Sequence, residues 1–194
     1  MQDNIKNEEN FEIENNNQKK YESIYDMVSI VVSSILMVAV IFSFVFKIST
    51  VSGESMENTL HDGDKLIISA ITKDVEYGDV VVTSQPNAYE KVLIKRVIAV
   101  EGQTVWFDEN TGKVIVDGRA LDEPYIKEDM DFLASMSNLY TVPEGKVFVM
   151  GDNRNDSADS RDVNIGMIDE RYMVGKVVYR IGDTYLFNSD LKES

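Results

Sequence analysis

Near the middle of the chain, residues 91–100 read KVLIKRVIAV. Such a run of apolar and β-branched residues is typical of a β-strand. Side chains alternate between the two faces of a strand, so Lys95 is expected to share its face with Leu93, Val97 and Ala99. The stretch therefore predicts a strand that carries one lysine among apolar neighbours.

Other short apolar runs flank this strand, and they occupy residues 65–71, 79–83, 104–107, 114–116, 146–150, 175–181 and 184–187. Residues 104–107 and 114–116 are expected to pair as a hairpin, with a glycine-containing turn at residues 110–112. Residues 122–138 show the weakest pattern and are expected to form an exposed loop. Many short strands separated by glycine-containing turns predict a mainly β domain, an antiparallel sheet or barrel.

Before this region, residues 27–46 carry no charge. A helix of that length spans about 30 Å, the thickness of the bilayer core. A buried core helix is an alternative, and so is a cleavable signal peptide, whose apolar region is about 7–15 residues long. We expect an anchor helix at 27–47, a catalytic domain at 48–194, and a disordered tail at 1–26, which is polar and poor in aromatic residues.

The orientation of the anchor follows from the charges at its ends. Lys19 and Lys20 precede the span and Lys47 follows it. Positive charges favour the cytoplasmic side, so the N-terminus is predicted inside and the catalytic domain outside the cell membrane.

The composition excludes several classes of protein. The chain has no cysteine, one histidine (His61) and a net charge of -15. Disulfides, thiolate metal sites and cysteine nucleophiles are therefore absent, and a site of several histidines is impossible. Nucleic-acid binding needs a basic stripe, which this acidic chain lacks.

Three separate segments carry residues suited to chemistry. Residues 52–60, SGESMENTL, place a serine in a flexible loop, although a plain loop leaving the membrane would read the same way. Lys95 would act as a base if burial lowered its pKa by about 2–3 units, and would otherwise extend its ammonium to water. Residues 151–161, GDNRNDSADSR, form a polar loop that does not fit a calcium loop, because Ser157 stands where glycine is required.

Together, in this order after a membrane span, the three segments resemble the signature of bacterial type I signal peptidases. Residues 55–60 resemble the nucleophile segment, residues 95–98 the general-base segment, and residues 151–161 the most distinctive segment of the family; residues 77–81 resemble a further family strand. The short chain between Lys95 and Gly151 resembles the compact members from Gram-positive bacteria. The resemblance covers the chain beyond its tail.

The resemblance implies a serine endopeptidase with a Ser-Lys dyad, in which Ser55 attacks and Lys95 takes its proton. The Ser55 backbone N–H would donate to the oxyanion, and Ser157 would orient the lysine amine. Further implied residues are the ion pair Asp159–Arg161, the brace Asp152–Arg96, and the pocket residues Met56, Leu60, Leu93 and Ile94.

The implied substrates are preproteins, which would bind as an extended strand and be cut after small side chains. The other implied partners are membrane lipid and the secretion translocase, near which the chain would act. The chain is expected to be a monomer that uses no cofactor, metal or nucleic acid. Three positions depart from the family: Asn58 and Glu101 stand where proline is usual, and Gly53 lacks the hydroxyl that serves some relatives as a second oxyanion donor.

Two rival interpretations stay open at this point. Self-cleaving repressors also use a serine and a lysine, but they carry a DNA-binding domain and no membrane span. A tethered β-domain that has lost activity could instead bind a partner, although the joint presence of Ser55, Lys95 and Ser157 argues against it.

Overall fold

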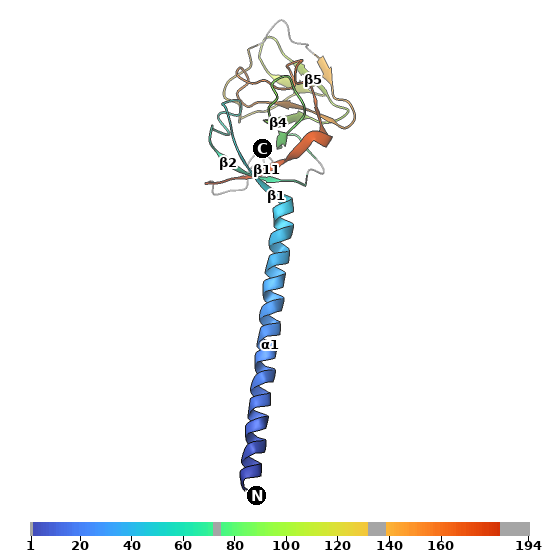
Figure 1. Ribbon diagram of the computed structural model, residues 1–194. Helices are drawn as coiled ribbons and strands as arrows, with labels where there is room; N and C mark the ends of the chain where they lie inside the picture. The colour runs from blue at the N-terminus through green and yellow to red at the C-terminus, as the bar shows by residue number, and fades with distance from the viewer. Residues whose placement is uncertain (1, 72–74, 132–138, 183–194) are drawn as a thin grey trace. The chain divides into compact units, whose positions relative to one another are not determined.

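The computed structural model describes residues 2–71, 75–131 and 139–182, with side chains from residue 20 onward. The chain divides into two compact units, Met1–Phe44 and Val45–Ser194, which are described one after the other. The first is helical and the second is built of strands (Figure 1).

The first unit belongs to one helix, α1, which covers Gln2–Val45. Its part Lys20–Val45 is long and apolar enough to cross a membrane, and none of its most apolar window is buried within the chain. The hydroxyls of Ser34 and Ser43 donate to the carbonyls of Ile30 and Val40, at 2.7 Å each. Such bonds let serine sit in an apolar helix, because the hydroxyl finds its partner inside the same helix.

Two boundaries differ from the sequence prediction. The helix already begins at Gln2, where a disordered tail was predicted for residues 1–26. Glu, Gln and Lys are good helix formers, and extending an existing helix is much easier than starting one. The helix also ends at Val45, two residues before the predicted end of the anchor helix at Lys47, because Phe46 already pairs with Ser69 in a sheet.

The second unit contains a seven-stranded antiparallel sheet with the order β1-β2-β11-β3-β4-β9-β10. Its strands are β1 (Phe46–Thr50), β2 (Lys65–Ser69), β3 (Val80–Thr83), β4 (Leu93–Ala99), β9 (Lys146–Met150), β10 (Ile168–Asp169) and β11 (Met173–Arg180). A short 3-10 helix, η1 (Glu170–Tyr172), lies between β10 and β11 along the chain. Strands from both ends of this unit thus meet in one sheet.

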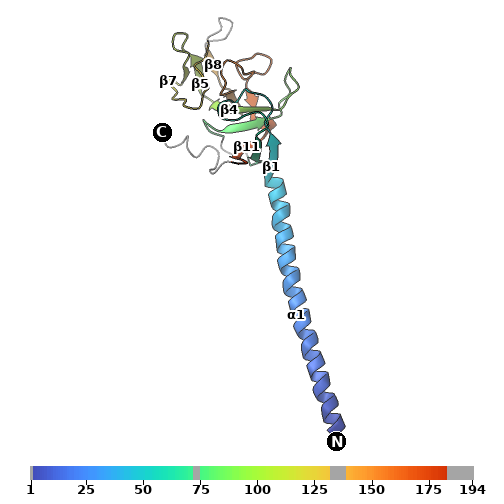
Figure 2. The same ribbon diagram turned by 90° about the vertical axis from the view of Figure 1, so that its left-hand side faces the viewer.

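A second, four-stranded sheet has the order β7-β6-β5-β8. Its strands are β5 (Thr104–Phe107), β6 (Val114–Val116), β7 (Arg119–Ala120) and β8 (Leu139–Thr141). Figure 2 shows β5, β7 and β8 close together in this part of the unit. The predicted hairpin is confirmed, since β5 and β6 pair antiparallel with Phe107 opposite Val114.

The mainly β, antiparallel prediction is confirmed, and three strands, at 104–107, 114–116 and 146–150, have the predicted bounds. Strands β1, β7, β8 and β10 were not predicted, because most are only two or three residues long and show no alternation. The strand predicted at 184–187 lies outside the described residues, as do residues 132–138 of the predicted loop.

Three apolar clusters fill the second unit. The first joins the two sheets, through residues such as Ile98, Phe148, Val105 and Phe107. The second lies beneath the segment that carries Ser55 and consists of Val51, Met56, Leu60, Leu66, Ile68, Val80, Val82 and Val177. The third includes Val81, Leu93, Val97, Val147, Val149, Ile165 and Ile168.

Side chains of strand β4 pack in or against all three apolar clusters. Leu93 and Val97 belong to the third cluster, as the alternation predicted, but Ala99 belongs to the first cluster together with its neighbour Ile98. The register of β4 against β9 shifts between Val97 and Ala99, and such an irregularity redirects the following side chains. The prediction that Ala99 shares the face of Lys95 is therefore wrong.

Candidate active site

The segment that carries Ser55 is a series of turns held at both ends. The backbone N–H of Val51 donates to the carbonyl of Asp64, and that of Gly53 donates to the Asp62 carboxylate, both at 2.8 Å. Gly53 has a φ of 92°, a left-handed conformation that glycine adopts without strain. Buried Met56 anchors the segment in the core. Ser55 is therefore presented on a fixed loop.

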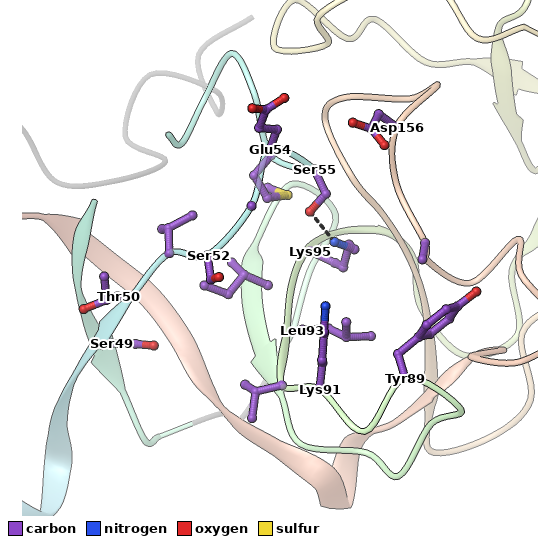
Figure 3. Close-up of a pocket in the computed structure, with 16 residues that line it drawn as sticks. Ser49, Thr50, Ser52, Glu54, Ser55, Tyr89, Lys91, Leu93, Lys95 and Asp156 are labelled. Carbon is purple, nitrogen blue, oxygen red and sulfur yellow. Dashed lines mark hydrogen bonds between the residues drawn. The ribbon is translucent and has the colours of Figure 1, made fainter. Parts of the chain in front are cut away.

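Lys95 meets Ser55 directly, although the two residues are 40 positions apart. The Lys95 Nζ donates a hydrogen bond to Ser55 Oγ at 2.6 Å (Figure 3). Strand β4 places the lysine opposite Val81 of β3, and only 3% of its surface is exposed. A serine hydroxyl within hydrogen-bond reach of a buried amine is the arrangement of a nucleophile beside its base.

Burial lowers the pKa of Lys95 from 10.5 to about 8. The negative charges of Asp159 and Asp152 oppose this shift, and the positive charge of Arg161 adds to it. No carboxylate is hydrogen-bonded to the amine among the described residues, so desolvation dominates. The amine therefore loses its proton close to neutral pH, as a general base must.

Arg96, the next residue on β4, is fully buried and paired. Its Nε and Nη2 donate to the two carboxylate oxygens of Asp152, at 2.8 and 2.7 Å, and its Nη1 donates to the carbonyl of Gly78. Asp152 also accepts from the Thr59 hydroxyl at 2.5 Å. This bidentate pair ties the strand of Lys95, the loop that follows β9 and the segment of Ser55 together.

Asp159 organises the loop that follows β9. Its buried carboxylate accepts from the guanidinium of Arg161, the hydroxyl of Ser157 and the backbone N–H of Gly151, at 2.7 to 2.9 Å. Burial would raise the pKa of Asp159, but the hydrogen bonds from Arg161 outweigh it and hold the pKa below its usual value. Asp159 therefore stays ionised, and its charge is paired with Arg161 and not with Lys95.

Ser157 has a different partner from the one that the family resemblance implies. Its hydroxyl donates to Asp159 at 2.7 Å, and in the described part of the chain Lys95 Nζ hydrogen-bonds only Ser55. An alanine methyl built on Gly151 would lie 2.3 Å from the Ser157 hydroxyl and 2.4 Å from the Ser55 carbonyl oxygen. Only glycine at position 151 allows the Ser157 hydroxyl and the Ser55 carbonyl to lie so close to the loop backbone.

A cavity of about 380 Å³ opens beside Ser55 and Lys95. Three of the four predicted pocket residues, Met56, Leu93 and Ile94, line it together with Ser55 and Lys95. The fourth, Leu60, is fully buried in the core below the serine segment and is not among the lining residues. Further residues of the wall, labelled in Figure 3, include Ser49, Thr50, Ser52, Tyr89, Lys91 and Asp156.

A second set of buried polar residues escaped sequence reasoning. Arg154 forms a bidentate ion pair with Glu123, at 2.9 and 2.6 Å, and the ring of Tyr125 lies 4.0 Å from the Arg96 guanidinium carbon. Glu123 and Tyr125 fall in the stretch predicted as an exposed loop. That prediction is wrong for these residues, because their partners come from distant segments that no local pattern reveals.

The remaining departures concern loops. Glu101 accepts from the backbone N–H of Gly145 at 2.8 Å and so joins two turns. Asn58 is exposed within the turn between Ser55 and Leu60. His61 is 59% exposed, and its backbone N–H donates to Asp64. None of the three touches the lysine amine.

An antiparallel β-domain in which a serine hydroxyl meets a buried amine fits the class of serine peptidases, and comparisons with known proteins identify the family. The family model described as signal peptidase, peptidase S26, matches residues 24–181. The chain therefore belongs to the signal peptidase family, peptidase S26, which confirms the resemblance seen in the sequence.

Two individual relatives support this family assignment. Signal peptidase I of Bacillus licheniformis is 32% identical over 174 residues, which cover 84% of this chain and 90% of the relative. Signal peptidase IB of Staphylococcus aureus (strain Mu50 / ATCC 700699) is 33% identical over 181 residues, which cover 83% and 90%. The crystal structure of a signal peptidase I from Enterococcus faecalis V583 is 30% identical, covers 54% of this chain and 97% of its own, and has a TM-score of 0.42.

Proposed function

We propose that this chain is a membrane-anchored serine endopeptidase that removes signal peptides from exported preproteins, with Ser55 as nucleophile and Lys95 as general base. One observation carries the proposal: the Lys95 amine lies 2.6 Å from the Ser55 hydroxyl and is almost completely buried. Membership in the signal peptidase family supplies the substrate class.

In the first half of the reaction, neutral Lys95 accepts the proton of the Ser55 hydroxyl while the oxygen attacks the scissile carbonyl carbon. The carbonyl oxygen becomes an oxyanion, which the Ser55 backbone N–H can stabilise. The C–N bond then breaks, the ammonium of Lys95 returns its proton to the leaving amine, and an ester to Ser55 remains.

In the second half, a water molecule takes the place of the leaving amine. Lys95 accepts a proton from this water as its oxygen attacks the ester carbonyl. The tetrahedral adduct collapses, the proton passes from Lys95 to the Ser55 oxygen, and the signal peptide leaves with a free carboxylate. Both halves use the same base, and neither needs a metal or a cofactor.

The lining of the cavity supports binding of an apolar, extended stretch of the preprotein. Its wall beside Ser55 is apolar, through Met56, Leu93 and Ile94, and β4 begins there at Leu93. A peptide in extended conformation can place alternate side chains in such a wall while its backbone pairs with neighbouring strands. The preference for small residues before the cut follows from the substrate class, because signal peptides end in A-x-A-like sequences.

The helix α1 supports anchoring in the cell membrane. Residues 27–47 would hold the chain in the bilayer, with the N-terminus in the cytoplasm and residues 48–194 outside. Two lysines before the span and one after it favour this orientation. The catalytic domain would then act where signal peptides emerge from the translocase.

The test is cleavage of a labelled preprotein in membranes by the full chain and its Ser55→Ala and Lys95→Ala variants. Each variant should lose at least about a thousandfold in kcat/KM, because the two groups act as a unit. Ser84→Ala and Lys113→Ala are matched controls, since both residues are exposed and neither lines the cavity. Cleavage that survives in both dyad variants would overturn the proposal.

A further inference from the structure

Asn153 holds the peptide groups on both sides of Ser55. Its backbone N–H donates to the Ser55 carbonyl at 3.1 Å, and its side-chain Nδ2 donates to the Glu54 carbonyl at 3.2 Å. Only 2% of Asn153 is exposed, so its two donors are shielded from bulk water. The catalytic serine is thus fixed by its neighbouring carbonyls as well as by its own side chain.

The bond to Glu54 determines the direction of a second group. The Glu54 carbonyl and the Ser55 N–H belong to one trans peptide, in which they point in opposite directions. Holding the carbonyl toward Asn153 therefore turns the Ser55 N–H away from Asn153. In the described part of the chain this N–H donates no hydrogen bond, and Ser55 lines the cavity.

A buried ion pair between Arg154 and Glu123 holds Asn153 in place. Arg154, the residue after Asn153, donates through Nε to the Gly151 carbonyl at 3.1 Å and through both terminal nitrogens to Glu123, which lies outside the loop. Burial opposes the charge of Arg154, but the bonds to Glu123 raise its pKa. The backbone N–H of Lys127 also donates to the Asp152 carbonyl, so residues 123–127 brace the turn at two points.

We propose that Asn153 is a positioning residue that directs the Ser55 N–H toward the substrate's oxyanion, and that Glu123 keeps Asn153 in place through Arg154. The inference rests on the proposed function, because it assumes that Ser55 is the nucleophile. It also addresses the hydroxyl that Gly53 lacks: with no side-chain donor at that position, the direction of the backbone donor carries more of the stabilisation.

The experiment compares Asn153→Ala with Asn155→Ala in the full chain. Asn155 lies in the same loop, but its side chain contacts residues 129 and 131 instead of the Ser55 peptides. Loss of an oxyanion donor costs about a hundredfold to a thousandfold in kcat, so a misdirected donor should cost about tenfold to a hundredfold. We expect this loss in kcat for Asn153→Ala, with KM and the pH of half-maximal activity unchanged, and near-wild-type kinetics for Asn155→Ala.

Inhibitor binding separates positioning from folding. A peptide boronic acid ending in alanine forms a tetrahedral adduct with the serine, whereas the corresponding peptide amide binds without reacting. Asn153→Ala should weaken binding of the boronic acid by the same factor by which it lowers kcat, and it should leave the affinity for the peptide amide unchanged. Equal weakening of both ligands, or kinetics equal to those of Asn155→Ala, would overturn the role of Asn153.

The part played by Glu123 is tested by a double-mutant cycle. Glu123→Gln alone should reproduce the kinetic loss of Asn153→Ala, and the double variant should lose no more than Asn153→Ala does. Additive losses would show that Glu123 acts independently and would overturn that half of the proposal. If the wild type and Ser55→Ala cleave equally, the proposed function itself fails. This result differs from every outcome that would overturn the roles of Asn153 and Glu123.

Discussion

Two neighbouring residues of β4, Lys95 and Arg96, are both buried cations with opposite surroundings. Arg96 has a bidentate carboxylate, a backbone carbonyl and an aromatic ring around its guanidinium. Lys95 has apolar neighbours and one hydroxyl. Because a strand alternates its faces, one residue step separates a charge that is fully compensated from one that is not.

These different surroundings give Arg96 a structural role and allow Lys95 a chemical one. Breaking a buried ion pair is costly, since it leaves an uncompensated charge, so Arg96 is bound to its structural role. A buried amine without a carboxylate partner can instead give up its charge when its pKa falls. The fold therefore stabilises the cation at position 96 and destabilises the one at position 95.

The largest effect is expected when the compensated cation loses its partner. Asp152→Ala leaves the Arg96 guanidinium buried without its carboxylate and removes the acceptor of Thr59. The free energy of unfolding should fall by about 3–5 kcal/mol. Urea denaturation of the full chain in detergent measures this, and a fall below 1 kcal/mol, on the order of an exposed pair, would remove the contrast between the two residues.

Removing the cation that lacks a carboxylate partner should stabilise the protein. Lys95→Met removes an amine whose pKa falls from 10.5 to about 8 on folding. The folded state binds fewer protons than the unfolded state between these pH values, so the cost is fully present below pH 8 and disappears above pH 10.5. At about 1.4 kcal/mol per pKa unit, the shift from 10.5 to about 8 makes the expected gain at pH 7 about 3 kcal/mol.

The same denaturation series supplies its own control. The stability difference between Lys95→Met and the wild type should shrink steadily as the pH rises from 8 to 10.5. A variant that is less stable than the wild type at pH 7 would mean that the buried amine is well compensated after all.

The pH dependence of cleavage sharpens the comparison further. Only the neutral amine can accept the serine proton, so kcat/KM should rise about tenfold per pH unit below the pKa of Lys95 and level off above about pH 8. Steady-state kinetics on a preprotein peptide between pH 6 and pH 10 measures this. A flat profile over that range would exclude Lys95 as the titrating base.

The smallest effect is expected for an ion pair at the surface. Arg171 pairs with Asp169 at 2.6 Å, but its side chain is 85% exposed. Water and salt screen such a pair, so Arg171→Ala should leave both the melting temperature and the activity unchanged within error. A shift as large as that of Asp152→Ala would show that burial is not what distinguishes the ion pairs of this protein.

Sequence reasoning predicted the strands whose residues alternate or are continuously apolar, and it placed Lys95 among Leu93 and Val97. It failed where partners are distant in the chain. Glu123 is an ordinary surface residue until Arg154 reaches it, and β1 is predictable only once β2 is available to pair with it. The helix over residues 2–26 was missed because composition alone does not show that a neighbouring helix can extend into it.

Three of the contacts that the family resemblance implies are present in the structure, and one is not. The meeting of Ser55 and Lys95, the pair Arg96–Asp152 and the pair Asp159–Arg161 all lie where the family resemblance placed them. The hydrogen bond of Ser157 differs, since a serine hydroxyl can turn to any of several acceptors and sequence contains no information on that choice.

Gly151 brings the loop after β9 so close to Ser55 that no side chain fits between them. Two stretches separated by almost a hundred positions are therefore packed backbone against backbone, which leaves little room for adjustment when a peptide arrives. The position of Ser55 is therefore fixed when the chain folds, and the site does not have to rearrange at the start of each turnover.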